Sequence, residues 1–316
     1  MSSHMRGPLL VSSARRGLLE NLRIEAAGGE GDLITVFDDF DQTIITDTFG
    51  GTGFEANGWI ASAIGVVAAD SITQNSTTTG AQNSCIRLNA GTAADTGGNL
   101  QLSSSATVFD YPHIKIPASG VAATILDNTR YVFACRIGLM SNAATWDGKA
   151  FIGWAEEVDA QILTSATGVI TQAETGPLVG FHIPEDGSID AISQRTVNTA
   201  YAAGTNFTEL YAAGSANGTA NIPEWYDLAV VLDITDMSDN AANGRTTFYH
   251  RRVRSSALDP TLPEWIRHPT VLSNQTPNNN LNLTPTIELQ NGPANQSDLF
   301  VDWWAFGATR YSRTGR

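Results

Sequence analysis

The amino-acid sequence predicts an all-β protein, an antiparallel β-sandwich or barrel that spans residues 32–309. About a dozen short segments show the two-residue alternation of apolar and polar side chains that is typical of strands. Gly, Asn, Asp or Pro separates these segments, as expected for tight turns. Charged residues make up 16% of the 316, well below a typical quarter, while the 42% of hydrophobic residues is enough for a core. No internal repeat is visible, which argues against a propeller or a solenoid.

The strand-like segments follow one another without a helical pattern of note between them, so the connections are those of an antiparallel fold. The run 226–234 is the least distinctive, because a short apolar run fits a strand or a buried helix. The long polar stretch 273–285 predicts a surface loop. The predicted strands are 33–40, 58–68, 84–90, 98–105, 130–140, 150–156, 178–184, 188–195, 205–212, 224–235, 245–253, 284–292 and 299–308.

Residues 1–31 differ from the rest and predict an N-terminal arm with one short amphipathic helix. Leu18, Leu19 and Leu22 stand near helical spacing, and Ser13 can cap the helix. A helix this short is marginal in water by itself. Its leucines therefore need a surface to cover them, either on the sandwich or on another subunit.

Charge is distributed unevenly along the chain, whose formal net charge is −14. Residues 1–24 carry Arg15 and Arg16 among four arginines against one acid, and the tail 310–316 carries Arg313 and Arg316 among three arginines without an acid. The intervening residues hold 31 acidic and 11 basic side chains. An acidic body repels nucleic acid and anionic membranes. Basic ends on an acidic body suggest docking onto an acidic partner surface; the alternative is that they only keep frayed ends soluble.

The last strand-like segment, "LFVDWWAFGA" (299–308), has two largely apolar faces, so both should be covered. The favoured interpretation is a closing strand of the core, and the alternative is an aromatic platform for a sugar. Strict alternation predicts the following two faces: Leu299, Val301, Trp303 and Ala305 on one, and Phe300, Asp302, Trp304 and Phe306 on the other.

A basic run, "FYHRRVRSS" (248–256), stands out in the acidic body. As a strand it would place Arg252 and Arg254 on one face and Arg251 on the other. The run could contact an acidic partner or a phosphate, or it could simply be an exposed strand.

Few motifs in the sequence carry chemistry. No histidine spacing suited to zinc and no nucleotide-binding or serine-hydrolase signature is present, so we expect no cofactor and no metal. The acids of "FDDFDQ" (37–42) favour a solvated strand end, with a calcium site as the alternative. Cys85 and Cys135 lie in apolar runs and are expected to be buried free thiols. No secretory signal and no apolar run long enough for a membrane span is found, so we expect synthesis in a reducing cytoplasm.

The stretch "WAEEVDAQ" (154–161) resembles the catalytic strand of laminarinase-like glycosidases, in which three acids share one face. Glu157 and Asp159 fit the first two positions, but Gln161 occupies that of the acid/base. An amide cannot protonate a leaving group, so the sequence predicts that the chain is not an enzyme.

The order of features resembles the concanavalin-A/laminin-G-like jelly rolls found among virion proteins of tailed bacteriophages. "VFDDF" opens the sandwich, "RYVFACRIGLM" leads to "AFIGWAEEVDA" and "GPLVGFHIPEDGSIDAIS", and "LFVDWWAFG" closes the fold beside the first strand. The resemblance covers about residues 33–308, and it departs at "FYHRRV", where relatives tend to have a neutral hairpin.

This resemblance implies a jelly-roll fold and a structural protein of a phage particle, most plausibly a capsid decoration or cement subunit on the virion surface, assembled in the host cytoplasm. The partners it implies are the major capsid protein and sister subunits in a homo-oligomer, with a trimer as one form. The arm would dock through Arg15, Arg16 and its leucines. Alternatives are a carbohydrate-binding module of a tail or fibre, with Trp59, Trp146 and Trp225 as candidate contacts, and, less favoured, a laminarinase-like hydrolase.

Overall fold

The computed structural model describes seventeen segments of the chain, and these form two antiparallel sheets. Residues 1–30 of the predicted arm and 312–316 of the predicted tail lie outside the described residues, whereas Gly31 begins β1 and residues 310–311 end β17. Within the described part there is no helix, and so none long and apolar enough to cross a membrane. The described residues are 31–38, 46–48, 59–64, 71–75, 85–89, 96–102, 114–115, 129–141, 145–156, 163, 178–194, 207–216, 222–233, 245–253, 264–273, 282–292 and 297–311.

The larger sheet, here sheet A, has nine strands. Their spatial order is β15 (Ile266–Ser273), β14 (Arg245–Val253), β13 (Glu224–Asp233), β8 (Thr129–Ser141), β17 (Ser297–Tyr311), β5 (Cys85–Asn89), β4 (Ser71–Asn75) and β2 (Thr46–Thr48), and β1 (Gly31–Asp38) also pairs with β17. β1 and β5 pair with successive parts of β17 and therefore share one side of it. The predicted pairing of the closing strand with the first strand is confirmed.

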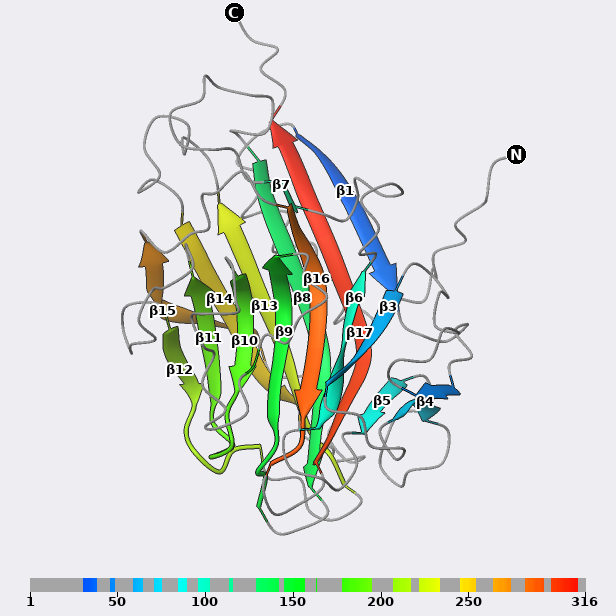
Figure 1. The fold of residues 1–316 in the computed structure, drawn as a ribbon. Helices are drawn as coiled ribbons and strands as arrows, with labels where there is room; N and C mark the ends of the chain where they lie inside the picture. The colour runs from blue at the N-terminus through cyan, green and yellow to red at the C-terminus, as the bar shows by residue number, and fades with distance from the viewer. Residues whose placement is uncertain are drawn as a thin grey trace, which may run out of the picture.

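The second sheet, sheet B, has eight strands. Their order is β12 (Phe207–Tyr211), β11 (Ile189–Gln194), β10 (Leu178–Ile183), β9 (Lys149–Glu156), β16 (Asn282–Gln290), β6 (Gly97–Leu102) and β3 (Trp59–Ile64), with β7 (Ile114–Lys115) also paired to β16. Figure 1 shows β9 and β16 of this sheet lying over β8, β13 and β17 of sheet A. The fold is thus a two-layer antiparallel sandwich, and the predicted fold class is confirmed.

The main core fills the space between the sheets, because it draws inward-facing residues from both. Trp154 of β9 is fully buried there, with its ring 5.5 Å from that of Phe133 on β8 and 6.0 Å from that of Phe306 on β17. Burial of each such side chain stabilises the fold by about 1.5–3 kcal/mol. Cys135 and Cys85 are buried free thiols, as predicted.

Both outer faces are covered as well, which explains the weak alternation of several strands. On sheet A, Trp303, Ala305 and Tyr249 belong to one buried cluster, and Phe300 and Trp225 belong to another. On sheet B a third cluster includes Phe151 and Leu178. The prediction that both faces of the closing strand are covered is therefore confirmed.

The predicted faces of the closing strand are wrong beyond Val301, because the strand contains a bulge. Val301 pairs with Ile137, but Trp303 pairs with Arg136, so Asp302 is an extra residue. An extra residue reverses the facing of everything after it. Trp304 and Phe306 therefore join Leu299 and Val301 in the core, while Trp303 and Ala305 lie on the outer face.

Strand β15, which contains Pro269, is not among the strands that the sequence predicts. Proline lacks the N–H that a sheet ladder needs and is confined to edges and bulges. β15 is indeed an edge strand of sheet A, and its pairing with β14 shifts register between Thr247 and Tyr249. Residues 268–270 of β15 therefore lie opposite a single residue of β14, Phe248. Of the run 226–234, which the sequence left ambiguous, residues 226–233 belong to strand β13 and residue 234 lies outside the described residues.

Candidate functional site

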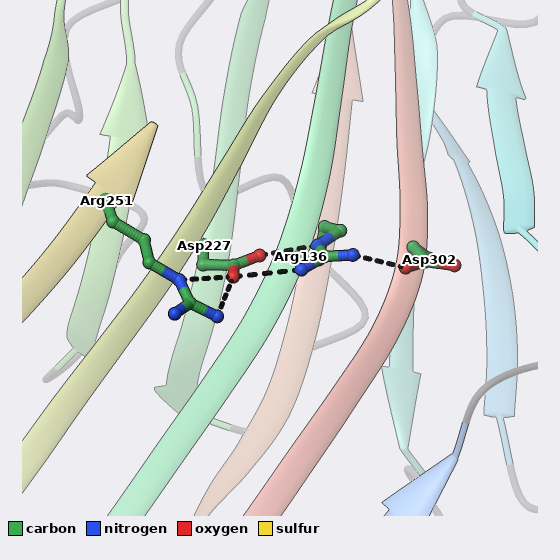
Figure 2. Close-up of polar contacts among 4 residues, drawn as sticks. All are labelled: Arg136, Asp227, Arg251 and Asp302. Atoms are coloured by element: carbon green, nitrogen blue, oxygen red, sulfur yellow. Dashed lines mark hydrogen bonds and ion pairs between the residues drawn. The ribbon is translucent and has the colours of Figure 1, made fainter. Parts of the chain in front are cut away.

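Four charged side chains form a buried chain of ion pairs on the outer face of sheet A, the arginine–aspartate cluster (Figure 2). They come from four neighbouring strands: Arg251 from β14, Asp227 from β13, Arg136 from β8 and Asp302 from β17. Each is at most 6% exposed. Two arginines and two aspartates balance in charge, as buried charges must.

Asp227 lies at the centre, because both of its register partners are arginines. Arg136 donates from Nε to its Oδ1 at 2.6 Å and from Nη2 to its Oδ2 at 3.0 Å. Arg251 Nε donates to Oδ2 at 2.7 Å from the other side. The bulge brings Asp302 within 3.4 Å of Arg136 Nη1.

The electrostatics favour the charged state of Arg136. Burial lowers the pKa of Arg136, but hydrogen bonds and charge from Asp227 and then from Asp302 outweigh it, so the pKa lies above its ordinary value. Beneath the cluster, on the inner face, burial and the charge of Asp227 raise the pKa of Cys135, which keeps this thiol unreactive. The cluster is therefore a charge-neutral group of buried ion pairs that links four strands, and it is not an open binding site.

The expectation that Arg251 is available to a partner is wrong, because Arg251 is 4% exposed and its guanidinium stacks 4.6 Å from the ring centre of Trp265. Arg252 does face the opposite side, as predicted, and its half-exposed side chain pairs with Glu224 at 2.8 Å. Arg254 lies outside the described residues.

A second group, the edge cluster, is formed by Tyr211, Tyr226, His250 and His268 where the edge strand of each sheet meets the other. β12 and β15 contact each other there and lie side by side at the left of the view in Figure 1. The ring of Tyr211 lies 4.8 Å from that of Tyr226 and 4.9 Å, edge to face, from that of His250. The ring of His268 follows at 6.1 Å from that of His250.

The edge cluster holds two enclosed polar atoms. Tyr226 Oη donates a hydrogen bond to the carbonyl of Ser215. In contrast, Tyr211 Oη and His250 Nδ1 are buried and have no hydrogen-bond partner among the described residues. Burial, and then the charge of His268, lower the pKa of His250 to about 4. Burial raises the pKa of Tyr226 to about 12 and that of Tyr211 further above its ordinary value. Both tyrosines and His250 are thus uncharged at neutral pH.

The remaining candidate residues are either buried or outside the described part. Trp146 and Trp225 are each 3% exposed, which removes them as a surface platform for a sugar, and the side chain of Trp59 is not described. β9 ends at Glu156, so Glu157, Asp159 and Gln161 of the glycosidase-like motif lie outside, as do Asp39 and Asp41. No group of three or more His, Cys, Asp or Glu suited to a metal occurs among the described residues.

The docking residues of the two ends also lie outside the described part: Arg15, Arg16, Leu18, Leu19, Leu22, Arg313 and Arg316. Sequence reasoning missed both clusters. Asp227 and Asp302 looked like isolated acids in apolar strands, and only their rarity in such strands was a signal. Their partners are set by cross-strand register, which a single sequence does not contain.

Comparisons with known proteins found no matching family model and no matching curated protein. Among solved structures, a Shewanella oneidensis protein of unknown function is similar over 98% of this chain and 99% of its own, with 10% identity and a TM-score of 0.41. Lectin II from Ulex europaeus is similar over 88% of this chain and 99% of its own, with 10% identity and a TM-score of 0.45. A glycosyl hydrolase family 16 protein from Mycobacterium smegmatis is similar over 86% and 98%, with 12% identity and a TM-score of 0.41.

These comparisons carry no argument about what this chain binds. They nevertheless correct the prediction that the chain is not an enzyme. A glycosyl hydrolase is among the structures similar to it, so this architecture gives no ground for excluding catalysis.

Proposed function

We propose that this chain is a docking subunit of a phage particle, a decoration or cement protein held on an acidic surface of the shell by its two basic ends. The observation that carries the proposal is the pairing of β1 with β17, in which Gly31 stands opposite Tyr311. Residues 1–30 and 312–316 therefore attach to adjacent strand ends at one edge of the sandwich (Figure 1). Paired antiparallel residues are about 5 Å apart.

This pairing brings together the attachment points of two groups of arginines that are far apart in the sequence. The arginines of residues 1–24 and those of 310–316 are tethered to the same place, while the intervening body is strongly acidic. At physiological salt, charges act on one another over about 8–10 Å. The two segments can thus act together on one acidic partner surface, such as that of a major capsid protein, whereas the body is repelled by it.

The arm adds an apolar contribution. Leu18, Leu19 and Leu22 can each contribute about 1.5–3 kcal/mol when a partner or sister subunit buries them. Among the side chains that the structure describes, the only large apolar ones that are exposed are those of Ile222 and Ile266. This supports anchoring through the ends, because the described body offers little other apolar surface for association.

The test is binding of purified full-length protein to phage particles stripped of it, compared with variants lacking residues 1–30, residues 312–316 or both. We expect each single truncation to weaken binding and the double truncation to abolish it, with circular dichroism showing an intact β fold throughout. Charge reversal of Arg15 and Arg16 to Glu should act like the first truncation. A matched control, Arg267→Glu, alters an exposed arginine of the body that lies outside the basic run and should leave binding unchanged.

A copy count on gradient-purified particles gives the second measurement. Hundreds of copies per particle fit a decoration subunit, and a dozen or fewer would move the chain to the tail. Absence from particles, or full binding by the doubly truncated protein, would overturn the proposal.

A further inference from the structure

Two polar side chains on the outer face of sheet B hold one residue from beyond the end of β9. Glu288 and Gln290 stand two residues apart on β16, so both point to the same face, and both are fully buried. The residue that they hold is Leu163, which is also fully buried and is the one described residue between Glu156 and Leu178. The docking proposal does not use this contact.

Both backbone polar groups of Leu163 are bound by these two side chains. The N–H of Leu163 donates to Glu288 Oε1 at 3.0 Å, and the carbonyl of Leu163 accepts from Gln290 Nε2 at 2.9 Å. Gln290 Nε2 also donates to Glu288 Oε1 at 2.8 Å, so both hydrogens of this carboxamide are used. The three groups close a ring of hydrogen bonds, here called the backbone clamp.

The backbone clamp explains why a carboxylate is tolerated on this face. Glu288 lies opposite Phe151 in the register of β16 and β9, and Phe151 belongs to the apolar cluster of the face. A carboxylate buried beside apolar side chains is unfavourable unless N–H groups bond it. Leu163 and Gln290 supply two such groups, and one of them is a peptide N–H.

The side chain of Leu163 adds a specific contact to these general ones. It is buried in a cluster with Phe151, Ala155, Leu178 and Ile192. Leu163 also forms an isolated β-bridge, as a residue of an extended chain does. Recognition of an extended peptide combines main-chain hydrogen bonds, which give affinity, with side-chain contacts, which give specificity. Both parts are present here in the contacts of a single residue.

We propose that the backbone clamp is a peptide-binding site for an extended segment with a central leucine, and that this chain's own Leu163 is its resident occupant. The clamp recognises the segment through one backbone N–H, one carbonyl and one aliphatic side chain. The same segment supplied as a free peptide should therefore bind once Leu163 no longer fills the site. A charged side chain in place of the leucine fits badly, because the apolar cluster would have to bury it.

The experiment measures binding of a fluorescein-labelled peptide of residues 159–167, DAQILTSAT, to full-length Leu163→Asp by fluorescence anisotropy. An aspartate should leave the apolar cluster and so free the clamp. We expect a Kd of about 100 μM for this variant and binding at least about 10-fold weaker to the parent, in which the site is filled. Leu163→Ala only truncates the side chain and should bind the peptide with intermediate affinity. Circular dichroism checks the β fold of each variant.

Controls separate the clamp from general apolar adsorption. The peptide with its leucine replaced by aspartate should not bind. Gln290→Met in the Leu163→Asp background keeps a side chain of similar length that cannot donate to the peptide carbonyl, and it should weaken binding about 10-fold. Gln101→Met, the matched change at a buried glutamine on the same face of β6, should leave the affinity unchanged.

Absence of peptide binding to both variants of Leu163 would overturn the proposal. So would equal binding of the aspartate-containing peptide, or unchanged affinity in Gln290→Met. None of these outcomes bears on particle binding, so this inference and the docking proposal stand or fall separately.

Discussion

At the scale of single residues, the most consequential choice is a carboxylate at position 227. Asp227 accepts hydrogen bonds from both Arg136 and Arg251, and all three side chains are buried (Figure 2). A buried ion-pair group is a weak source of net stability, but removal of one member leaves uncompensated charge. We expect such a cluster to favour the observed strand register, because a shifted register would separate the arginines from Asp227.

Asp227→Asn should lower the free energy of unfolding by about 3 kcal/mol or more, since two buried guanidinium groups lose their shared counter-charge. Urea denaturation measures the loss. Glu209→Gln, at an exposed position of β12, is the control and should stay within about 0.5 kcal/mol of the parent. A loss at 227 no larger than that of the control would show that the cluster is not stabilised by charge pairing.

A second residue-scale constraint lies in sheet B, where Gly153 of β9 pairs with Gly180 of β10. A Cβ atom on Gly153 would lie 2.3 Å from the backbone oxygen of Val179, closer than any real contact. Gly153→Ala should therefore destabilise the fold by about 3 kcal/mol, at the upper end of overpacking costs. Thermal unfolding tests this, and a parent-like midpoint would mean that the two strands can separate without cost.

At the scale of elements, β12 and β15 are the edge strands by which one side of each sheet meets the other sheet. β12 and β15 each have a ladder on one side only along the described order, and β15 contains Pro269, which blunts an edge against pairing with other chains. The rings of Tyr211, His250 and His268 follow one another from β12 to β15. The protonation state of these rings should therefore control how strongly β12 and β15 are held together.

The edge should loosen in acid. Histidine binds a proton with a pKa of about 6.5 when unfolded, and His250 does so at about 4 when folded. As pH falls from about 6.5 to about 4, the unfolded state gains protons first, so stability falls through this window and levels off below it. We expect a loss of about 1–2 kcal/mol after allowance for screening. Urea midpoints between pH 7 and pH 4 measure it, and an unaltered slope in His250→Gln would contradict this assignment.

At the scale of the whole molecule, the first and the last described strands of the chain, β1 and β17, pair with each other. β1 and β17 lie together although their residues are nearly the whole chain apart, and β17 pairs with β8 and β5 as well. Strand β17 is thus the organising element of sheet A, and its pairing with β1 sets where the arm and the tail depart. Pairings of such long range make folding slow, because loop-closure entropy must be overcome before they form.

Because Gly31 and Tyr311 are register partners, a short Gly/Ser linker should join them without strain. Head-to-tail cyclisation of residues 31–311 should raise the free energy of unfolding by about 2–4 kcal/mol relative to the linear 31–311 chain, chiefly by restricting the unfolded state. Thermal unfolding of the two forms measures this. A lower midpoint in the cyclic form would mean that the ends are not held as paired.

The sequence alone was sufficient for the fold class, for the strand nature of most segments and for the buried closing strand, because two-residue alternation is a local property of the chain. The sequence was also sufficient to show that the two ends are basic and the intervening body is acidic. It could not place Trp303 and Trp304 on their correct faces, because one bulged residue at Asp302 reverses the pattern and leaves no local sign.

The tertiary structure decided everything that depends on register between strands. Arg251 looked like a surface contact in sequence, yet Asp227 and Trp265 enclose it. Tyr211 and His250 became neighbours only because the edges of two different sheets meet. The two basic ends, at opposite extremes of the sequence, depart from adjacent strand ends because β1 pairs with β17. Partners across a sheet are chosen by the packing of the whole chain, so no single segment encodes them.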